Sequence, residues 1–348
     1  MPDPSYAYQS QQASLFKPYY QRWLWDWTLN ALPRSLSPNA MTVIGTLCCA
    51  ASFGLAATLN HSPVALLIAA VLIIAYLSLD NLDGAQARRL GKSSRLGEFL
   101  DHWLDTLNNG FVFTGACLAA ELPPLLTLAV LCSGTLAFYA VQWELRATGV
   151  FRMGRIADIE GNTAVALLYV GLAIFGPQLF RIQLVPGLPT AATLLGCGVI
   201  AQSFWTTLSA VRKTSHHRAD FLPLIAASAV LCAWAWLGEQ TPLSYLAAAF
   251  FLNPVFTSGP IRDRLRLAPV SRMLDWTIVA AIGALTLLST TSLRGMIDVD
   301  LAGSALVTGL AVVTLHYFAT SVAKLRDESR VARRGDPITE SSAPPRRP

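Results

Sequence analysis

Long apolar runs separated by short polar stretches dominate this chain. Each run is close to the roughly 20 residues that a helix needs to cross a bilayer. The runs cover residues 40–59, 63–82, 100–120, 123–144, 162–177, 188–211, 221–238, 243–258, 273–291 and 302–323. The pattern predicts an all-α polytopic membrane protein with about ten transmembrane helices.

A different pattern precedes the first run. Apolar and aromatic residues recur at helical spacing, with charged and amide residues between them. The apolar positions are Leu15, Phe16, Tyr19, Tyr20, Trp23 and Trp27. This alternation predicts an amphipathic helix in the membrane interface, where aromatic rings anchor at headgroup level. The first 30 residues lack a basic start followed by an apolar core, so no cleavable signal peptide is expected.

The composition agrees with a membrane protein, because 53% of residues are hydrophobic and only 14% are charged. With ten spans and a cytoplasmic N-terminus, all 26 Lys and Arg residues except Arg181 and Arg294 fall on the cytoplasmic side. The positive-inside rule therefore predicts that both termini are cytoplasmic. The net charge of +5 is then a topological bias that attracts anionic lipid headgroups, not a signal for nucleic acid. The Arg-rich segment 262–272 is expected to be a solvated, lipid-facing charge run.

Six cysteines all fall inside the apolar runs, and none forms a C-x-x-C pair. Neither a disulfide framework nor a zinc site is therefore expected.

Four carboxylates stand at the adjoining ends of the second and third runs. Asp80 and Asp83 are three residues apart, and Asp101 and Asp105 are four apart. On helices, residues at these spacings share a face. The connecting loop is short enough for the two helices to be antiparallel neighbours, so the four side chains should converge at the cytoplasmic end. Ionisable residues at membrane depth are costly and usually functional.

Such a cluster needs a cation, because neighbouring carboxylates otherwise repel and take up protons. Oxygen ligands without cysteine favour Mg²⁺ or Mn²⁺ over zinc. Two such ions can stabilise the attacking and leaving oxygens of a displacement at phosphorus. Arg88, just over one turn beyond Asp83, could add donors to the same phosphates. A single Asp near a helix end is more often a helix cap or a member of an ion pair. Four Asp residues at helical spacing, together with Gly84 and Arg88, favour a metal and phosphate site.

The spacing of these residues is similar to the signature of the CDP-alcohol phosphotransferases. That signature is filled by Asp80, Asp83, Gly84, Ala87, Arg88, Gly97, Asp101 and Asp105. Further likeness is to the choline/ethanolamine phosphotransferase branch. It is carried by Asp101-His102-x-x-Asp105, by Pro38-Asn39-x-x-Thr42 and by the loop from Gly154 to Gly161 with its acidic residues.

The resemblance implies roles for individual residues. Asp80, Asp83, Asp101 and Asp105 would hold two divalent ions, Mg²⁺ or Mn²⁺. Arg88 would bind the diphosphate of CDP-choline or CDP-ethanolamine, with Gly84 beside it, and Asn39 would contact the cytidylyl alcohol. Diacylglycerol would be the acceptor, so a phospholipid would form and CMP would leave.

The proton acceptor is left open between two residues. The resemblance implies His102 in the branch with Asp-His and the last carboxylate, Asp105, in the wider family. We favour His102, because a neutral imidazole accepts a proton near pH 7. Glu160, at the start of the fifth run, could orient the acceptor.

These assignments divide the chain into four parts. Residues 1–38 form the interfacial helix and entry turn, and 39–180 the catalytic core. Residues 181–323 add further transmembrane helices, and 324–348 form a charged, Pro-rich cytoplasmic tail expected to be disordered. The membrane would be a bacterial inner membrane or, in a eukaryote, that of the ER or Golgi. The family resemblance also implies a possible homodimer.

Two alternative functions stay open at this point. One is transfer from CDP-diacylglycerol to a small polar alcohol, although enzymes of that kind usually have about six spans. The other is an ion-coupled transporter, whose carboxylates should instead lie near mid-membrane on broken helices.

Overall fold

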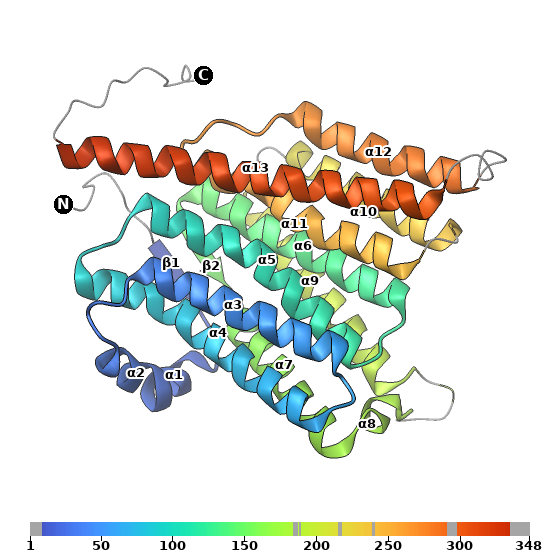
Figure 1. The fold of residues 1–348 in the computed structure, drawn as a ribbon, viewed down its shortest axis with the longest axis horizontal. Helices are drawn as coiled ribbons and strands as arrows, with labels where there is room; N and C mark the ends of the chain where they lie inside the picture. The colour runs from blue at the N-terminus through green and yellow to red at the C-terminus, as the bar shows by residue number, and fades with distance from the viewer. Residues whose placement is uncertain are drawn as a thin grey trace.

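Long helices packed side by side make up nearly the whole molecule (Figure 1). The computed structural model describes residues 9–183, 187, 189–214, 218–238, 241–290 and 298–334. Its long helices are α3 (Pro38–Thr58), α4 (Pro63–Leu90), α5 (Arg95–Ala119), α6 (Pro124–Thr148), α7 (Asp158–Phe175), α9 (Ala191–Lys213), α10 (Leu222–Leu237), α11 (Pro242–Arg264), α12 (Arg272–Thr290) and α13 (Val299–Arg334). Each covers one predicted run, so the prediction of an all-α protein with about ten long helices is confirmed.

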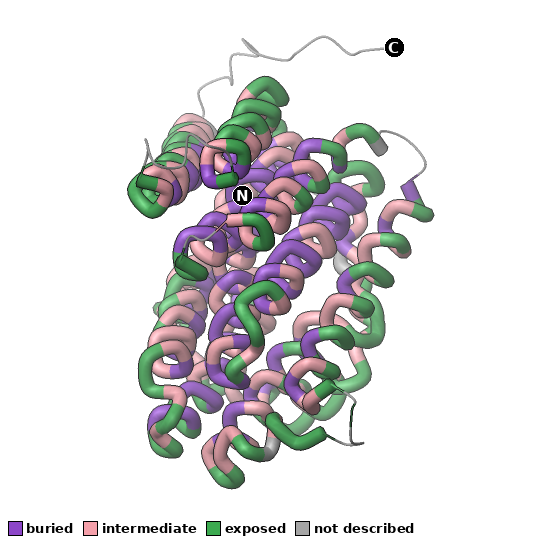
Figure 2. The backbone as a smooth tube through the Cα atoms, turned by 90° about the vertical axis from the view of Figure 1, so that its right-hand side faces the viewer, coloured by how far each residue is buried: buried purple, intermediate pink, exposed green. Residues whose placement is uncertain are grey.

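Eight helices in the described part of the chain are long and apolar enough to cross a membrane. Helices α5 and α11 are not among them, because each carries several charged or amide side chains. Both lie inside the bundle, where α11 packs against α5, α6 and α13. Figure 2 shows this separation, with buried residues on the inner helices and exposed residues on the outside. The protein is a multi-pass membrane protein whose most polar helices face other helices rather than lipid.

Local signals place the ends of the two carboxylate-bearing helices. Gly91 ends α4 in a left-handed conformation (φ 61°), which a glycine adopts without a steric penalty. The hydroxyl of Ser94 then caps α5 by accepting a hydrogen bond from the Gly97 amide at 3.1 Å. Helix α4 thus continues eight residues past the predicted end of its run, and Asp80, Asp83 and Arg88 all lie on it.

The carboxylates of α4 and α5 converge as predicted, but the backbones of the two helices do not pack closely against each other. Helix α3 packs closely against both, whereas α4 and α5 have few direct contacts. Small side chains on α3 permit this approach; for example, Gly45 lies against Tyr76 and Leu79 of α4. On its other side α4 packs against α7. The carboxylates of α4 and α5 therefore meet across a space that α3 flanks.

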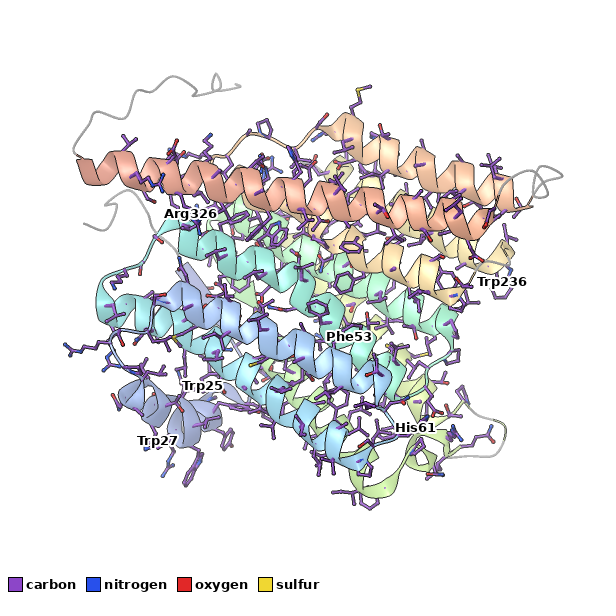
Figure 3. All side chains as sticks on the ribbon, in the orientation of Figure 1. Trp25, Trp27, Phe53, His61, Trp236 and Arg326 are labelled. Atoms are coloured by element: carbon purple, nitrogen blue, oxygen red, sulfur yellow. The ribbon has the colours of Figure 1, made fainter. Side chains whose placement is uncertain are left out.

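The N-terminal segment is amphipathic, as predicted, and it is helical without a break over residues 17–31, with a π-helical turn in the middle. It consists of α1 (Lys17–Tyr20), a π-helical turn (Gln21–Trp25) and α2 (Asp26–Ala31) beside α4 (Figure 1). Trp25 is 3% exposed and packs on the bundle, whereas Trp27 is 71% exposed and points away from it (Figure 3). The exposed aromatic face is the one expected to meet the interface.

Four short elements were not predicted. Strand β1 (Gln9–Gln12) pairs in parallel with β2 (Val150–Met153), with Gln9 opposite Val150. A short helix, α8 (Gln178–Arg181), follows α7, and a 3₁₀ turn (Arg218–Phe221) precedes α10. The β1–β2 pair connects the N-terminal segment to the loop between α6 and α7.

The C-terminal part departs from the sequence predictions in two places. Helix α13 continues to Arg334, so the first part of the segment expected to be a disordered tail is helical; residues 335–348 lie outside the described part. Arg262, expected in a solvated loop, belongs to α11 and is 7% exposed. Four backbone and hydroxyl oxygens surround its guanidinium, so the charge is solvated by protein.

Candidate active site

Three carboxylates, one from α4 and two from α5, lie close together near the connection between these two helices. This is the end of the bundle that the sequence predicts to face the cytoplasm. One oxygen from each of Asp80, Asp101 and Asp105 lies within 4.8 Å of the other two. All three side chains are partly buried. The site is at the end of the bundle where α4 is joined to α5, the same end as the start of β1 and the end of α13 (Figure 1).

Asp83 points to a different neighbour. It is 6% exposed, and its Oδ2 accepts a hydrogen bond from the Thr42 hydroxyl of α3. The same hydroxyl lies 3.2 Å from the Pro38 carbonyl oxygen. Asp83 is not among the residues whose oxygens lie within 4.8 Å of one another, although its charge acts on Asp80, Asp101 and Asp105. The predicted group of four is therefore one compact set of three plus Asp83 beside it.

Asp105 is held from two helices. Its Oδ1 accepts hydrogen bonds from the Tyr76 hydroxyl of α4 at 3.2 Å and from Asn108 Nδ2 at 3.3 Å. Asn108 Nδ2 in turn lies 3.3 Å from the Thr46 hydroxyl of α3. The three helices α3, α4 and α5 thus all contribute to the orientation of one carboxylate.

The donor set fits a hard divalent ion. It consists of carboxylate oxygens only, at a spacing that one ion could span, with no sulfur among them. Mg²⁺ and Mn²⁺ both prefer such oxygen ligands.

The glycines of the signature lie against the polar residues beside the cluster. A Cβ at Gly84 would be 3.5 Å from Nη1 of Arg88, so this guanidinium lies back over the helix. A Cβ at Gly97 would be 3.4 Å from Oδ1 of Asn39, which brings the start of α3 next to the start of α5. Arg88 is exposed at the rim of the site and can meet a soluble anion.

His102 lies beside the cluster in sequence but on another face of α5. It is 3% exposed, its Nδ1 is 2.9 Å from Gln142 Nε2 of α6, and its ring contacts the edge of Phe151 in β2. It is not one of the three residues that share the possible ion site. His61, by contrast, lies at the opposite end of the bundle, at the turn between α3 and α4 (Figure 3).

Glu160 has a set of contacts that its sequence position did not predict. Its Oε1 accepts hydrogen bonds from the Ser14 hydroxyl at 2.6 Å and from the Leu15 amide at 2.8 Å. Its Oε2 accepts one from the Ala157 amide at 3.2 Å. Glu160 therefore fastens the N-terminal segment to the start of α7.

Asp158 was missed as a site residue. It begins α7 and interacts electrostatically with Asp80, Asp101 and Asp105. The signal was present in the acidic loop from Gly154 to Gly161, where Asp158 stands two residues before Glu160. The carboxylates that act on one another at this site therefore include Asp158, and also Glu98 beside Asp101, in addition to the predicted four.

A known protein family matches the part of the sequence that contains this site. Residues 35–205 match the family described as CDP-alcohol phosphatidyltransferase. The matched region contains α3 to α7, and with them every carboxylate of the site. The predicted resemblance is confirmed.

Several individual proteins are similar to this chain over about half of its length. Cholinephosphotransferase 1 of Gallus gallus is 33% identical over 190 residues, which are 52% of this chain and 56% of that protein. Cholinephosphotransferase 1 of Homo sapiens is 32% identical over 179 residues, 49% of this chain and 44% of that protein. An uncharacterized CDP-alcohol phosphatidyltransferase class-I family protein of Dictyostelium discoideum is 26% identical over 233 residues, 62% of this chain and 56% of that protein. The chain spans about half the length of these relatives.

Proposed function

We propose that this protein transfers a phosphoalcohol from a CDP-alcohol, CDP-choline or CDP-ethanolamine, to diacylglycerol, forming a phospholipid and releasing CMP. The observation that carries the proposal is the convergence of Asp80, Asp101 and Asp105 within a matched CDP-alcohol phosphatidyltransferase domain. The names of the vertebrate relatives support choline as one of the headgroups.

Different residues would bind the metal ions, the diphosphate and the cytidylyl group. Asp80, Asp83, Asp101 and Asp105 would hold two divalent ions, Mg²⁺ or Mn²⁺, which would neutralise charge on the diphosphate. Arg88, exposed at the rim, would bind the same diphosphate. Asn39 and Gly84 would line the approach of the cytidylyl group.

The reaction is a single displacement at phosphorus. The hydroxyl oxygen of diacylglycerol forms a bond to the β-phosphorus of the CDP-alcohol, and the bond from that phosphorus to the bridging oxygen breaks. CMP leaves with the bridging oxygen, and the hydroxyl proton passes to a base on the protein. No covalent enzyme intermediate forms.

His102 and Asp105 are the two groups proposed to take the proton, with His102 first. In the structure Gln142 Nε2 lies 2.9 Å from His102 Nδ1, where an amide N–H donates to the ring nitrogen. For His102 to accept the proton at Nε2, the Gln142 amide must turn over so that its oxygen accepts from Nδ1–H. Asp105 lies within the carboxylate set, and a role there as ligand competes with a role as base. A His102→Ala variant is expected to lose turnover while it still binds the CDP-alcohol; equal loss of both would favour Asp105.

We further propose that the site and both chain ends face the cytoplasm. The excess of Lys and Arg on that side supports this orientation. A soluble nucleotide and a membrane-bound hydroxyl can both reach a site at this end of the bundle. Cysteine-accessibility labelling at Arg22 and His61, which lie toward opposite ends, tests the orientation.

The central experiment uses the purified full chain in nanodiscs that contain diacylglycerol. CDP-choline, CDP-ethanolamine and CDP-diacylglycerol with glycerol phosphate are offered separately, each with Mg²⁺, with Mn²⁺ or with EDTA. We expect CMP and a phospholipid from at least one of the first two donors, and none with EDTA. Product formation only from CDP-diacylglycerol would favour the alternative transfer, and no CMP from any donor would exclude the enzyme.

Paired variants connect the activity to the carboxylates. Asp101→Asn is expected to abolish turnover, because it removes one charge from the ion site. Asp26→Asn serves as the matched control, since Asp26 is exposed on α2 and has no place in the site. Full activity of Asp101→Asn would contradict the proposed ion site.

A further inference from the structure

The N-terminal segment is fixed in place directly beside the carboxylate site. Besides the bonds to Glu160 already described, the Phe16 amide donates to the same Oε1 at 3.1 Å. The Ser14 hydroxyl, while donating to Glu160, accepts from the Lys17 amide at 3.0 Å. Together with the β1–β2 pairing, these bonds fix the main chain of Lys17 relative to the start of α7.

The side chain of Lys17 is half-buried at this junction. Its ammonium interacts electrostatically with Asp158, which attracts it, and with the guanidinium of Arg88, which repels it. Burial lowers the pKa of Lys17, and Asp158 opposes that change. The hydrogen-bond acceptor of the ammonium is the neutral side chain of Gln12.

The bonds to Glu160 therefore hold Lys17 near the start of α7, where its charge and that of Arg88 act on each other beside the carboxylate site. An anion placed between Lys17 and Arg88 would remove their mutual repulsion. The same anion would otherwise be repelled by the carboxylates below it. The amide oxygen of Gln12 can be exchanged for a phosphate oxygen, which forms a stronger, charge-assisted bond with the ammonium.

We propose that Lys17 is a second cationic ligand of the substrate diphosphate, carried to the site by the anchored N-terminal segment and acting together with Arg88. This inference rests on the proposed function, because the diphosphate belongs to the CDP-alcohol. It assigns the segment before the first span a part in substrate binding in addition to its contact with the membrane interface. Residues 9–17 lie outside the matched domain, so the domain alone would lack this ligand.

The test compares Lys17→Met with Lys17→Arg in the full chain in nanodiscs. Equilibrium binding of CDP-choline or CDP-ethanolamine is measured in the presence of Mn²⁺, together with KM for both substrates. Lys17→Met should weaken binding of the CDP-alcohol about tenfold, as expected for loss of one charge-assisted contact at a partly exposed site. Lys17→Arg should retain most of the affinity, and KM for diacylglycerol should not change.

Two further variants separate this role from a structural one. Arg22→Met removes a neighbouring cation that stacks on the exposed Trp23 ring, and it should leave nucleotide binding unchanged. Ser14→Ala removes one of the bonds that anchor the segment, together with the acceptor of the Lys17 amide, and should weaken nucleotide binding in the same direction as Lys17→Met but less. A lower melting temperature for Lys17→Met that Lys17→Arg does not share, with unchanged nucleotide affinity, would show a structural role and overturn the proposal.

The remaining outcomes are also decisive. If the wild-type protein binds a CDP-alcohol and Lys17→Met binds it equally well, the inference fails and the proposed function stands. If the Lys17→Met change alters only the dependence on anionic lipid, Lys17 contacts headgroups and the inference again fails. If the wild-type protein binds no CDP-alcohol, the proposed function fails and the inference falls with it.

Discussion

The Tyr76 hydroxyl of α4 donates a hydrogen bond to Asp105 Oδ1 of α5, with an oxygen–oxygen distance of 3.2 Å. Because these two helices have few direct contacts, the bond is a specific connection across the space that α3 flanks. Tyr76 is buried, so water does not readily replace it as a donor. The orientation of a carboxylate in the possible ion site is thus set partly by the helix opposite.

Tyr76→Phe removes this donor and little else. We expect Asp105 to become less well oriented and the divalent-ion concentration for half-maximal activity to rise about tenfold, within the range found when a hydrogen bond to a metal ligand is removed. The measurement is a Mn²⁺ titration of CMP release.

Tyr169→Phe is the matched control. Tyr169 is also buried, and its hydroxyl has no hydrogen-bond partner within the part of the chain that the structure describes. Its Mn²⁺ dependence should equal that of the wild type. Equal curves for all three proteins would show that Tyr76 does not act on the ion site.

Thr42 gives a second prediction, at Asp83. Thr42→Val keeps the shape of the side chain but leaves a buried carboxylate without its hydroxyl donor. A hydrogen bond to a charged group contributes about 1.5–3 kcal/mol, so the melting temperature of the metal-free protein should fall. Thr42→Ser should restore it. Thr58→Val, at an exposed hydroxyl near the end of the same helix, should change the melting temperature little. A fall of the same size in Thr58→Val would show that the effect of Thr42→Val does not come from the lost bond to Asp83.

The positions of the long helices could be predicted because membrane spans are local in sequence. A run of about 20 apolar residues specifies a helix, and the spacing of Asp101 and Asp105 specifies a shared face. The packing of one helix against another is not determined by the local sequence. Nothing in the loop between α4 and α5 indicates that α3 packs against both of them.

The N-terminal anchor could not be predicted for a related reason. Strand β1 reads Gln-Ser-Gln-Gln, with no alternation of apolar and polar residues to signal a strand. Its partner β2 is more than 130 residues away in sequence. Glu160 was noticed as a polar residue near the site, but its bonds to Ser14 and Leu15 depend on that distant pairing. The sequence therefore indicates that Glu160 lies near the site, but the contacts of its carboxylate cannot be predicted from it.

Gly110 on α5 gives a prediction about packing. A Cβ at this position would lie 2.5 Å from Cε2 of Phe250 on α11, closer than atoms can approach. Gly110→Ala should therefore force the two helices apart and cost about 1–3 kcal/mol of stability. Activity should fall as well, because α5 carries Asp101 and Asp105. The measurements are the melting temperature in detergent and the rate of CMP release.

The control for this variant is Gly309→Ala in α13, where an added Cβ would meet no heavy atom within 4 Å. Replacing glycine by alanine in an open helical position should leave stability unchanged or raise it slightly. Gly110→Ala combined with Phe250→Leu should recover part of the loss. Without that recovery, the clash with Phe250 would not be the cause.

Arg262 supports a final prediction, about a buried charge. Its guanidinium lies 3.2 Å from the carbonyl oxygens of Ala268 and Tyr317 and contacts two hydroxyls of α13, Thr320 and Ser321. These bonds join the end of α11 to α13, and they need the planar fork of arginine. Arg262→Lys keeps the charge but cannot reach all four acceptors, so it should cost about 1–3 kcal/mol. Arg266→Lys, at an exposed position four residues later, should have no effect on the melting temperature. Equal melting temperatures for the two variants would mean that the charge alone, and not the geometry of its donors, holds these helices together.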